Sequence, residues 1–268
     1  MIYNFLSKKL ENLYFKHKPN FFFMHIPKTG GTSIDSAFEK IYRLSYSRLK
    51  EAASQKTVEL LRNRSAQNQS IDFLETMRFR KSLLVYEMFR NTHFISGHTY
   101  FDTEVWNRFG HKYAYITVLR EPVKRYISYY FFNLEKPDKA HGKINQSLTD
   151  FLNSEKGRRA GKVYARYLCG NLERISANDF PNHDDIAKAK ENLKKFKAVG
   201  FLENIEAFKQ AVKKDFSLNI KIPYKNKNVA KNINISPEIT DQIRRNCQID
   251  LEIYNYAKNN FLSLRGEG

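Results

Sequence analysis

Cysteine is scarce in this sequence. Its two cysteines, Cys169 and Cys247, are too few for a disulfide framework or for a zinc site made of four cysteines. We expect both thiols to be reduced and structural, because free cysteine is among the most frequently buried residue types.

Long apolar runs are also missing near the start of the chain. The longest there is Phe21–Met24, which reaches Ile26 only by crossing His25. That is strand length, far below the roughly 20 residues that a membrane span needs. Residues 1–20 mix lysine and glutamate among the apolar positions, unlike the continuous apolar core of a signal peptide. We therefore expect a cytoplasmic protein.

Acidic residues are few relative to basic ones. The chain has 268 residues, with 28 Asp and Glu against 46 Lys and Arg, so its formal net charge is +18. At 41% hydrophobic residues it can bury a core, which excludes intrinsic disorder. The positive excess predicts a polyanionic partner, which composition alone leaves open as nucleic acid, an anionic membrane, a nucleotide cofactor or an acidic glycan.

Short apolar runs alternate with helical patterns along the chain. Strands are expected at residues 21–26, 92–96, 113–119 and 198–201, and helices at 32–43, throughout 47–90, from Pro122 to about 133, at 205–214, and from Ser236 past Tyr254. This order predicts an α/β fold with a P-loop-like, mainly parallel sheet flanked by helices on both faces, with additional helical segments. No internal repeat or long linker divides the chain, so we expect a single domain over residues 1–268 with a helical insert at 44–90.

Residues 22–33, F-F-M-H-I-P-K-T-G-G-T-S, carry the pattern of an anion-binding loop. Glycines let backbone N–H groups turn toward an anion, the following helix N-terminus adds partial positive charge, and Lys28 adds a full one. The pattern is not Walker A, because Lys28 precedes Gly30 and Gly31 instead of following them. The alternative is an ordinary strand, turn and helix with Thr32 or Ser33 as its N-cap.

Residues 118–130, V-L-R-E-P-V-K-R-Y-I-S-Y-Y, place Arg120 at the carboxyl end of a strand, where ligands bind in open α/β sheets. Ser128 follows about two helical turns later and can face the same crevice. An arginine fork with a hydroxyl suits a phosphate monoester. The structural alternative is that Arg120 caps the sheet edge or pairs with Glu121, while Ser128 lies on a helix surface.

A third segment, F-I-S-G-H-T-Y-F-D at residues 94–102, puts His98 at another strand's carboxyl end. Both protonation states of a histidine are accessible near neutral pH, so His98 is a candidate general base, although an isolated histidine is more often structural. Three other central histidines, His93, His111 and His141, have no comparable context.

Together these segments resemble the sulfotransferases that use 3′-phosphoadenosine 5′-phosphosulfate (PAPS), in particular the carbohydrate branch that includes heparan sulfate 2-O-sulfotransferase. The resemblance rests on P-K-T-G-G-T-S at 27–33, G-H at 97–98 and the arginine segment at 118–130. It continues weakly at 199–208 and 250–257, whereas 44–90 and 135–195 match poorly.

The resemblance implies a P-loop-like fold, an O-sulfotransferase activity of the EC 2.8.2 type, and PAPS as co-substrate with PAP as product, without a metal. The residues that it implies around the 5′-phosphosulfate are Lys28, Thr29, Gly30, Gly31, Thr32 and Ser33. Arg120 and Ser128 would bind the 3′-phosphate, and His98 would be the base, with Lys28 stabilising the leaving group. Asn228 and Lys231 would lie near the nucleotide.

One residue departs from the family pattern. The heparan enzyme has a second histidine two residues before the base, where this chain has Ser96. The departure weakens transfer of the acceptor's identity. It leaves a glycan, a glycolipid or another hydroxyl-bearing molecule as the acceptor. The absence of an N-terminal anchor, which Golgi members carry, favours a bacterial cytoplasmic enzyme or a chain trimmed of its anchor.

Two other function classes stay open from the sequence. One is a P-loop-like kinase or NTPase, for which Glu121 is the nearest candidate metal-binding carboxylate. The other is a non-enzymatic polyanion binder, although no nucleic-acid signature is present and we expect no nucleic-acid partner. Basic residues that could shape an acceptor site or meet an anionic membrane surface are Arg78, Arg80, Lys81, Arg158 and Arg159. Long basic helices are more often solvated faces.

Overall fold

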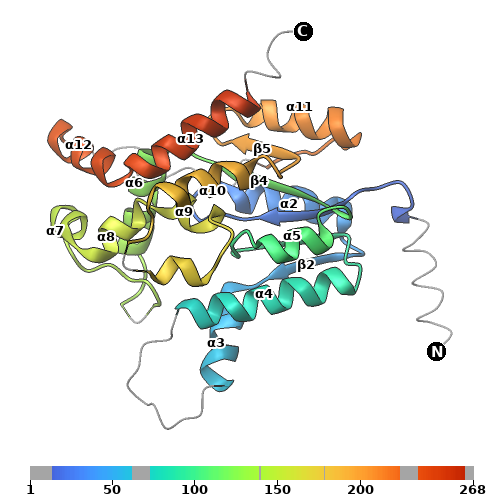
Figure 1. Ribbon diagram of the computed structural model, residues 1–268, viewed down its shortest axis with the longest axis horizontal. Coiled ribbons are helices and arrows are strands. Elements are labelled where there is room, and N and C mark those ends of the chain that lie inside the picture. Colours follow the sequence, from blue (N-terminus) through green and yellow to red (C-terminus); the bar gives the residue numbers. More distant parts are fainter. Residues whose placement is uncertain (1–13, 62–72, 139, 178, 224–234, 263–268) are drawn as a thin grey trace.

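The computed structural model describes residues 14–61, 73–138, 140–177, 179–223 and 235–262 (Figure 1). Its centre is a five-stranded sheet in the order β2-β3-β1-β4-β5, in which every neighbouring pair is parallel. The strands are β1 (Asn20–Met24), β2 (Tyr46–Leu49), β3 (Phe94–Gly97), β4 (Tyr113–Leu119) and β5 (Ala198–Phe201). The expected α/β class with a mainly parallel sheet is confirmed.

Helices cover both faces of this sheet. They are α2 (Gly31–Tyr42), α3 (Glu51–Leu61), α4 (Phe73–Phe89), α5 (Thr103–Phe109), α6 (Pro122–Leu134), α7 (Leu148–Asn153), α8 (Glu155–Ala160), α9 (Val163–Leu168), α10 (His183–Leu193), α11 (Ile205–Phe216), α12 (Pro237–Asn246) and α13 (Gln248–Phe261). A 3₁₀ turn at Glu173–Ser176 precedes α10. No helix within the described ranges is both long and apolar enough to cross a membrane.

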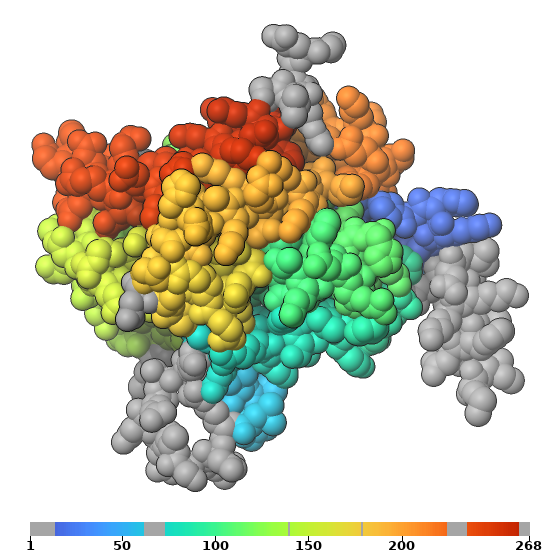
Figure 2. Space-filling model, viewed as in Figure 1, coloured from blue at the N-terminus to red at the C-terminus, as the bar shows by residue number. Residues whose placement is uncertain are grey.

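Alternation along the central strand divides the core into two layers. Phe21 and Phe23 of β1 pack with residues of α2 and α11, whereas Phe22 and Met24 pack with residues of α4, α5, α9, α10 and α13. Successive strand side chains point to opposite faces, so one apolar strand supplies both layers. In the space-filling view the second group of helices covers its face of the sheet closely (Figure 2).

Two sequence expectations were wrong in detail. Residues 47–90 were expected to be helical throughout, but Tyr46–Leu49 form the edge strand β2, in parallel register with β3. The ring of Tyr46 stacks on Phe94 at 5.7 Å between centroids, so pairing and packing override a local pattern without breakers. The expected terminal helix is also interrupted, because α12 ends and α13 begins on either side of Cys247.

Parallel pairing brings all five carboxyl ends to one edge of the sheet. In the register, Met24 of β1 lies beside Gly97 of β3 and Thr117 of β4. The residues that follow these strands therefore emerge next to one another, although they are far apart in sequence.

A buried carboxylate supports the wall of this edge. Asp250 of α13 is fully buried and accepts hydrogen bonds from the backbone N–H groups of Val163 at 2.7 Å and Tyr164 at 2.9 Å, which are donors at the start of α9. The Tyr164 hydroxyl in turn accepts from the Arg120 N–H at 2.8 Å and donates to the Arg120 carbonyl. Asp250 thus holds the helix that holds the end of β4.

Asp250→Ala should lower the free energy of unfolding by about 3 kcal/mol, because it leaves buried N–H groups of α9 unpaired. Urea denaturation followed by circular dichroism measures this change. Asp241→Ala is the matched control, because Asp241 is exposed on α12 and should change stability by less than about 0.5 kcal/mol. Equal stability of the two variants would contradict the capping role.

Burial raises the pKa of Asp250 to about 6, above its value in an unfolded chain. Folding therefore favours the protonated form, and this contribution to stability is complete at low pH and declines as the pH rises through about 6. The wild-type protein should show this decline in urea midpoints measured between pH 4 and pH 7, and Asp250→Ala should lack it. A parallel decline in both proteins would assign it to another group.

Candidate functional site

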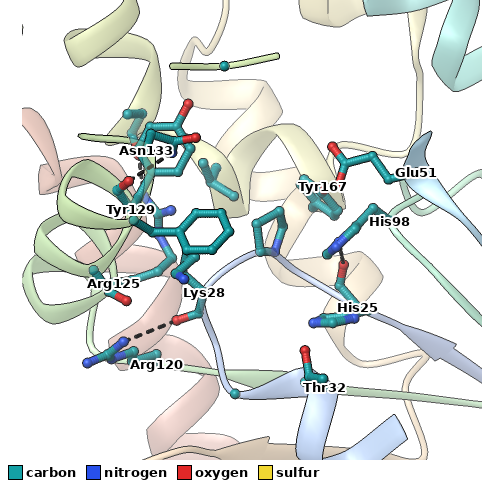
Figure 3. Close-up of a pocket in the computed structure, with 18 of the residues that line it drawn as sticks. His25, Lys28, Thr32, Glu51, His98, Arg120, Arg125, Tyr129, Asn133 and Tyr167 are labelled. Atoms are coloured by element: carbon teal, nitrogen blue, oxygen red, sulfur yellow. Dashed lines mark hydrogen bonds between the residues drawn. The ribbon is translucent and has the colours of Figure 1, made fainter. Parts of the chain in front are cut away.

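A cavity of about 990 Å³ lies at the carboxyl edge of the sheet. The residues after β1, β3, β4 and β5 contribute to its lining, as does Arg48 within β2, and helices α2, α3, α4, α6, α8 and α9 supply further walls. Figure 3 shows labelled side chains from several of these separate segments around this one space.

The loop after β1 forms one end of the cavity. Lys28 has φ 69° and Gly30 has φ 81°, both in the left-handed region, and helix α2 starts at Gly31. Such a turn before a helix aims backbone N–H groups at a common point, which suits an anion. Lys28, Gly30, Gly31, Thr32 and Ser33 all line the cavity, as the sequence predicts. No side-chain cap of α2 occurs at Gly30, so the expected alternative, a hydroxyl N-cap, is not what begins this helix.

Thr29 is the exception among the loop residues. Its side chain is fully buried, and its Oγ1 donates a hydrogen bond to the Ile26 carbonyl at 2.9 Å. It does not line the cavity. The Thr29 side chain therefore fixes the turn from within, and a contact of Thr29 with the phosphosulfate, which stays a prediction, would involve its backbone.

Lys28 and Arg120 lie together at this end. Arg120 Nη1 donates to the Lys28 carbonyl at 3.4 Å, and Lys28 Nζ lies 3.6 Å from the centroid of the Phe132 ring (Figure 3). Burial, followed by the charge of Arg120, lowers the pKa of Lys28 to about 8. Burial likewise lowers the pKa of Arg120. A bound anion would relieve both costs, so this end of the cavity favours negative charge.

Helix α6 adds two more residues. Ser128 is 6% exposed and lines the cavity with Arg120, as expected from its spacing. Arg125, for which the sequence predicts no role, also lines the cavity and is fully buried. Arg125 Nη2 donates to the Ala160 carbonyl, while its Nε and Nη1 have no hydrogen-bond partner within the described part of the chain. Unpaired buried donors are costly, so Arg125 adds donor capacity to the anion end.

His98 lies on the side of the cavity away from Arg120 (Figure 3). Its Nδ1 is 2.5 Å from the carbonyl oxygen of His25. A carbonyl can only accept, so Nδ1 carries the proton and Nε2 keeps a free lone pair. Burial is the main cause of a lowered pKa at His98, which keeps the imidazole neutral at pH 7. The ring is therefore in the tautomer and charge state of a general base.

His25 was taken only as an interruption of an apolar strand in the sequence. Its ring lines the cavity 4.3 Å from the His98 ring, with 37° between the planes, and stacks on Phe23. Ser96, the residue at the position of the family's second histidine, is buried in β3 and is not part of the lining. The imidazole beside His98 thus follows β1, a pairing that no local motif predicts.

Space beside His25 depends on a glycine. A Cβ built on Gly31 would overlap the His25 imidazole. The start of α2 and the ring that packs against the candidate base therefore occupy adjoining volume, and a side chain at position 31 would displace one of them.

The basic residues proposed for an acceptor site divide into two groups. Arg80 and Arg159 line the cavity. Arg78 pairs with Glu173, Lys81 pairs with Asp102, and Arg158 donates to the Asn153 carbonyl, so these three lie outside the lining. His141, to which the sequence gave no role, does line the cavity. Asn228 and Lys231 lie outside the described residues.

The remainder of the lining is rich in aromatic side chains. Its aromatic residues are Phe73, Tyr100, Tyr129, Phe132 and Tyr167. Tyr100 and Tyr167 pack edge to face at 4.6 Å between centroids. Within the described ranges, no group of three or more His, Cys, Asp or Glu side chains is arranged to hold a metal ion.

The model of the sulfotransferase family matches residues 11–257, nearly the whole chain. A search of curated proteins found no match.

The tautomer of His98 can be tested directly. The ¹⁵N chemical shifts of the imidazole at pH 7 should show a protonated Nδ1 and an unprotonated Nε2, because the His25 carbonyl fixes the proton on Nδ1. Comparison of spectra from the wild type and His98→Ala assigns the signals. A protonated Nε2 at pH 7 would contradict the base geometry.

Proposed function

This chain belongs to the sulfotransferase family, and we propose that it transfers the sulfuryl group of PAPS to a hydroxyl of a carbohydrate acceptor with His98 as general base. The observation that carries this proposal is His98, with its Nδ1 hydrogen-bonded to the His25 carbonyl, in the same cavity as the anion-binding loop of Lys28.

The anion end of the cavity has the groups that a 3′-phosphorylated nucleotide needs. The loop from Lys28 to Ser33 offers backbone N–H groups and a lysine to the 5′-phosphosulfate. Arg120 and Ser128 would take the 3′-phosphate, with the unpaired donors of Arg125 beside them. Bound PAPS would supply an activated sulfuryl group.

Two of the chain's residues would act in the transfer itself. His98 Nε2 takes the proton of the acceptor hydroxyl as its oxygen bonds to sulfur, because that nitrogen has the free lone pair. Lys28 and the loop N–H groups stabilise the charge that develops on the leaving phosphate oxygen as its bond to sulfur breaks. Sulfuryl transfer, like phosphoryl transfer, depends mainly on positioning and charge stabilisation.

The part of the cavity around His98 supports a sugar as acceptor. Tyr100 and Tyr167 offer ring faces, and Glu51 and Arg159 offer groups for hydrogen bonds with hydroxyls. Sites for small polar ligands combine such apolar walls with a few placed polar groups.

The kinase alternative needs a carboxylate to bind a metal ion, and the structure gives Glu121, the nearest candidate, a different role. That carboxylate accepts from the backbone N–H groups of Val123 at 3.2 Å and Lys124 at 2.8 Å and so caps α6. Calorimetry with adenosine 3′,5′-bisphosphate and with ATP plus Mg²⁺ separates the two functions, and a preference for ATP plus Mg²⁺ would refute the sulfotransfer proposal. A polyanion binder would retain its affinity for oligonucleotides in Arg120→Ala.

His98→Ala should reduce kcat by about 10²–10⁴-fold, the usual contribution of a general base, while the KM for PAPS changes little. Product formation from PAPS and a sugar acceptor measures both. His111→Ala is the control, because His111 is exposed and does not line the cavity. Near-normal turnover in a folded His98→Ala protein would remove His98 from the base role.

Arg120→Ala should weaken binding of adenosine 3′,5′-bisphosphate by about 10–100-fold, since a charge-assisted contact to a phosphate is lost. Binding of 5′-AMP, which lacks the 3′-phosphate, should change much less. Isothermal titration calorimetry with both nucleotides gives this comparison. An equal loss for the two nucleotides would place Arg120 elsewhere than at the 3′-phosphate.

A further inference from the structure

Glu51 is a charged residue of the cavity to which neither the sequence nor the mechanism above gives a role in proton transfer. It is the first residue of α3, directly after β2 and Lys50, and it is exposed within the cavity lining. Its carboxylate makes no hydrogen bond or ion pair with any described residue. In Figure 3 the side chains of Glu51 and His98 point into the same part of the cavity, next to Tyr167.

A single guanidinium fixes the backbone of both residues. Arg80 of α4 is 1% exposed, and its Nη1 donates to the His98 carbonyl at 3.0 Å while its Nη2 donates to the Glu51 carbonyl at 3.3 Å. Its Nε donates to Ser54 Oγ, one turn further along α3, at 2.7 Å. The guanidinium is planar and rigid, so it fixes the start of α3 relative to the loop after β3.

Four groups act on the charge of His98. They are His25, directly after β1, Arg48 of β2, Glu51 of α3 and Arg80 of α4. The Tyr167 side chain of α9 also lies next to His98. The guanidinium of Arg48 is itself held by the buried Asp35, with 3.3 Å between Nη1 and Oδ2. Burial and the two arginines disfavour a positive imidazole, whereas Glu51 favours it.

That balance matters when His98 receives a proton. The neutral imidazole suits its surroundings before the reaction, but the imidazolium formed during transfer would be buried beside two arginines. Among the four neighbouring groups, Glu51 is the one that carries a compensating negative charge.

We propose that Glu51 is a positioning residue for proton transfer, whose carboxylate, set beside His98 by the Arg80 clamp, stabilises the imidazolium. In the balanced step, the acceptor O–H proton moves to His98 Nε2, the acceptor oxygen bonds to sulfur, and the sulfur–oxygen bond to the nucleotide breaks with its electron pair on the phosphate. Glu51 keeps its charge throughout. The inference rests on the proposed function for its catalytic meaning, but the His98–Glu51 coupling exists in the free protein.

The first test needs no donor or acceptor. The pKa of His98, followed by NMR titration of its ring signal, should fall by about 1 unit in Glu51→Gln, because the negative charge that favours the imidazolium is lost. Glu59→Gln is the matched control, since Glu59 is exposed on the same helix and lies outside the cavity lining. An unchanged His98 pKa in folded Glu51→Gln would overturn the inference.

The second test uses turnover. In Glu51→Gln, kcat should fall about 10-fold, the acid limb of the pH–kcat profile should move to lower pH with the His98 pKa, and the KM for PAPS should hold. A purely structural role would lower kcat without moving the limb, and that result would overturn the inference. Glu51→Asp, which keeps the charge, should recover most of the His98 pKa and of kcat. Failure of Asp to do so in a folded protein would also count against it.

These outcomes separate the inference from the proposed function. If the wild type transfers no sulfuryl group, the sulfotransfer proposal fails while the titration still tests the coupling of Glu51 and His98. If Glu51→Gln does not fold, Glu51→Ala takes its place in the titration: a lowered His98 pKa supports the coupling, and an unchanged one opposes it.

Discussion

The hydrogen bond between His98 Nδ1 and the His25 carbonyl is the constraint on which the site depends. It joins the residues after two neighbouring strands, fixes the imidazole tautomer, and leaves Nε2 free toward the cavity. It can form because β1 and β3 are parallel neighbours that end together, with Met24 beside Gly97. Sheet register therefore determines which nitrogen of His98 can act as a base.

The sequence was sufficient for the parts of the fold and site that have local patterns. The Gly30–Gly31 turn, Arg120 after an apolar strand, and Pro122 at the start of a helix each have a nearby physical reason, and the structure places Arg120 and the loop in one cavity. β2 was missed because a four-residue edge strand is stabilised by pairing with β3, not by its own composition. Because residues 47–90 were expected to be helical throughout, the sequence did not indicate that Glu51 begins a helix just after a strand.

The missed site residues share a different cause. His25 and His98 are 73 positions apart, and Arg80 reaches both His98 and Glu51 from a separate helix. Nothing in the sequence around Arg125 indicates that its side chain is buried against the Ala160 carbonyl. Each depends on tertiary contacts between elements, for which one sequence contains no periodic signal. Part of the +18 charge comes from basic residues that line the cavity, among them Lys28, Arg120 and Arg125.

The contact between Gly31 and His25 couples two positions that a motif would treat as independent. Because a Cβ at position 31 would enter the volume of the His25 ring, the first residue of α2 and the ring that packs against His98 compete for the same space. A related sequence with alanine or serine at position 31 can keep this backbone only with a smaller or turned residue at position 25. The two sites should therefore vary together among relatives, and exchange of one alone should be poorly tolerated.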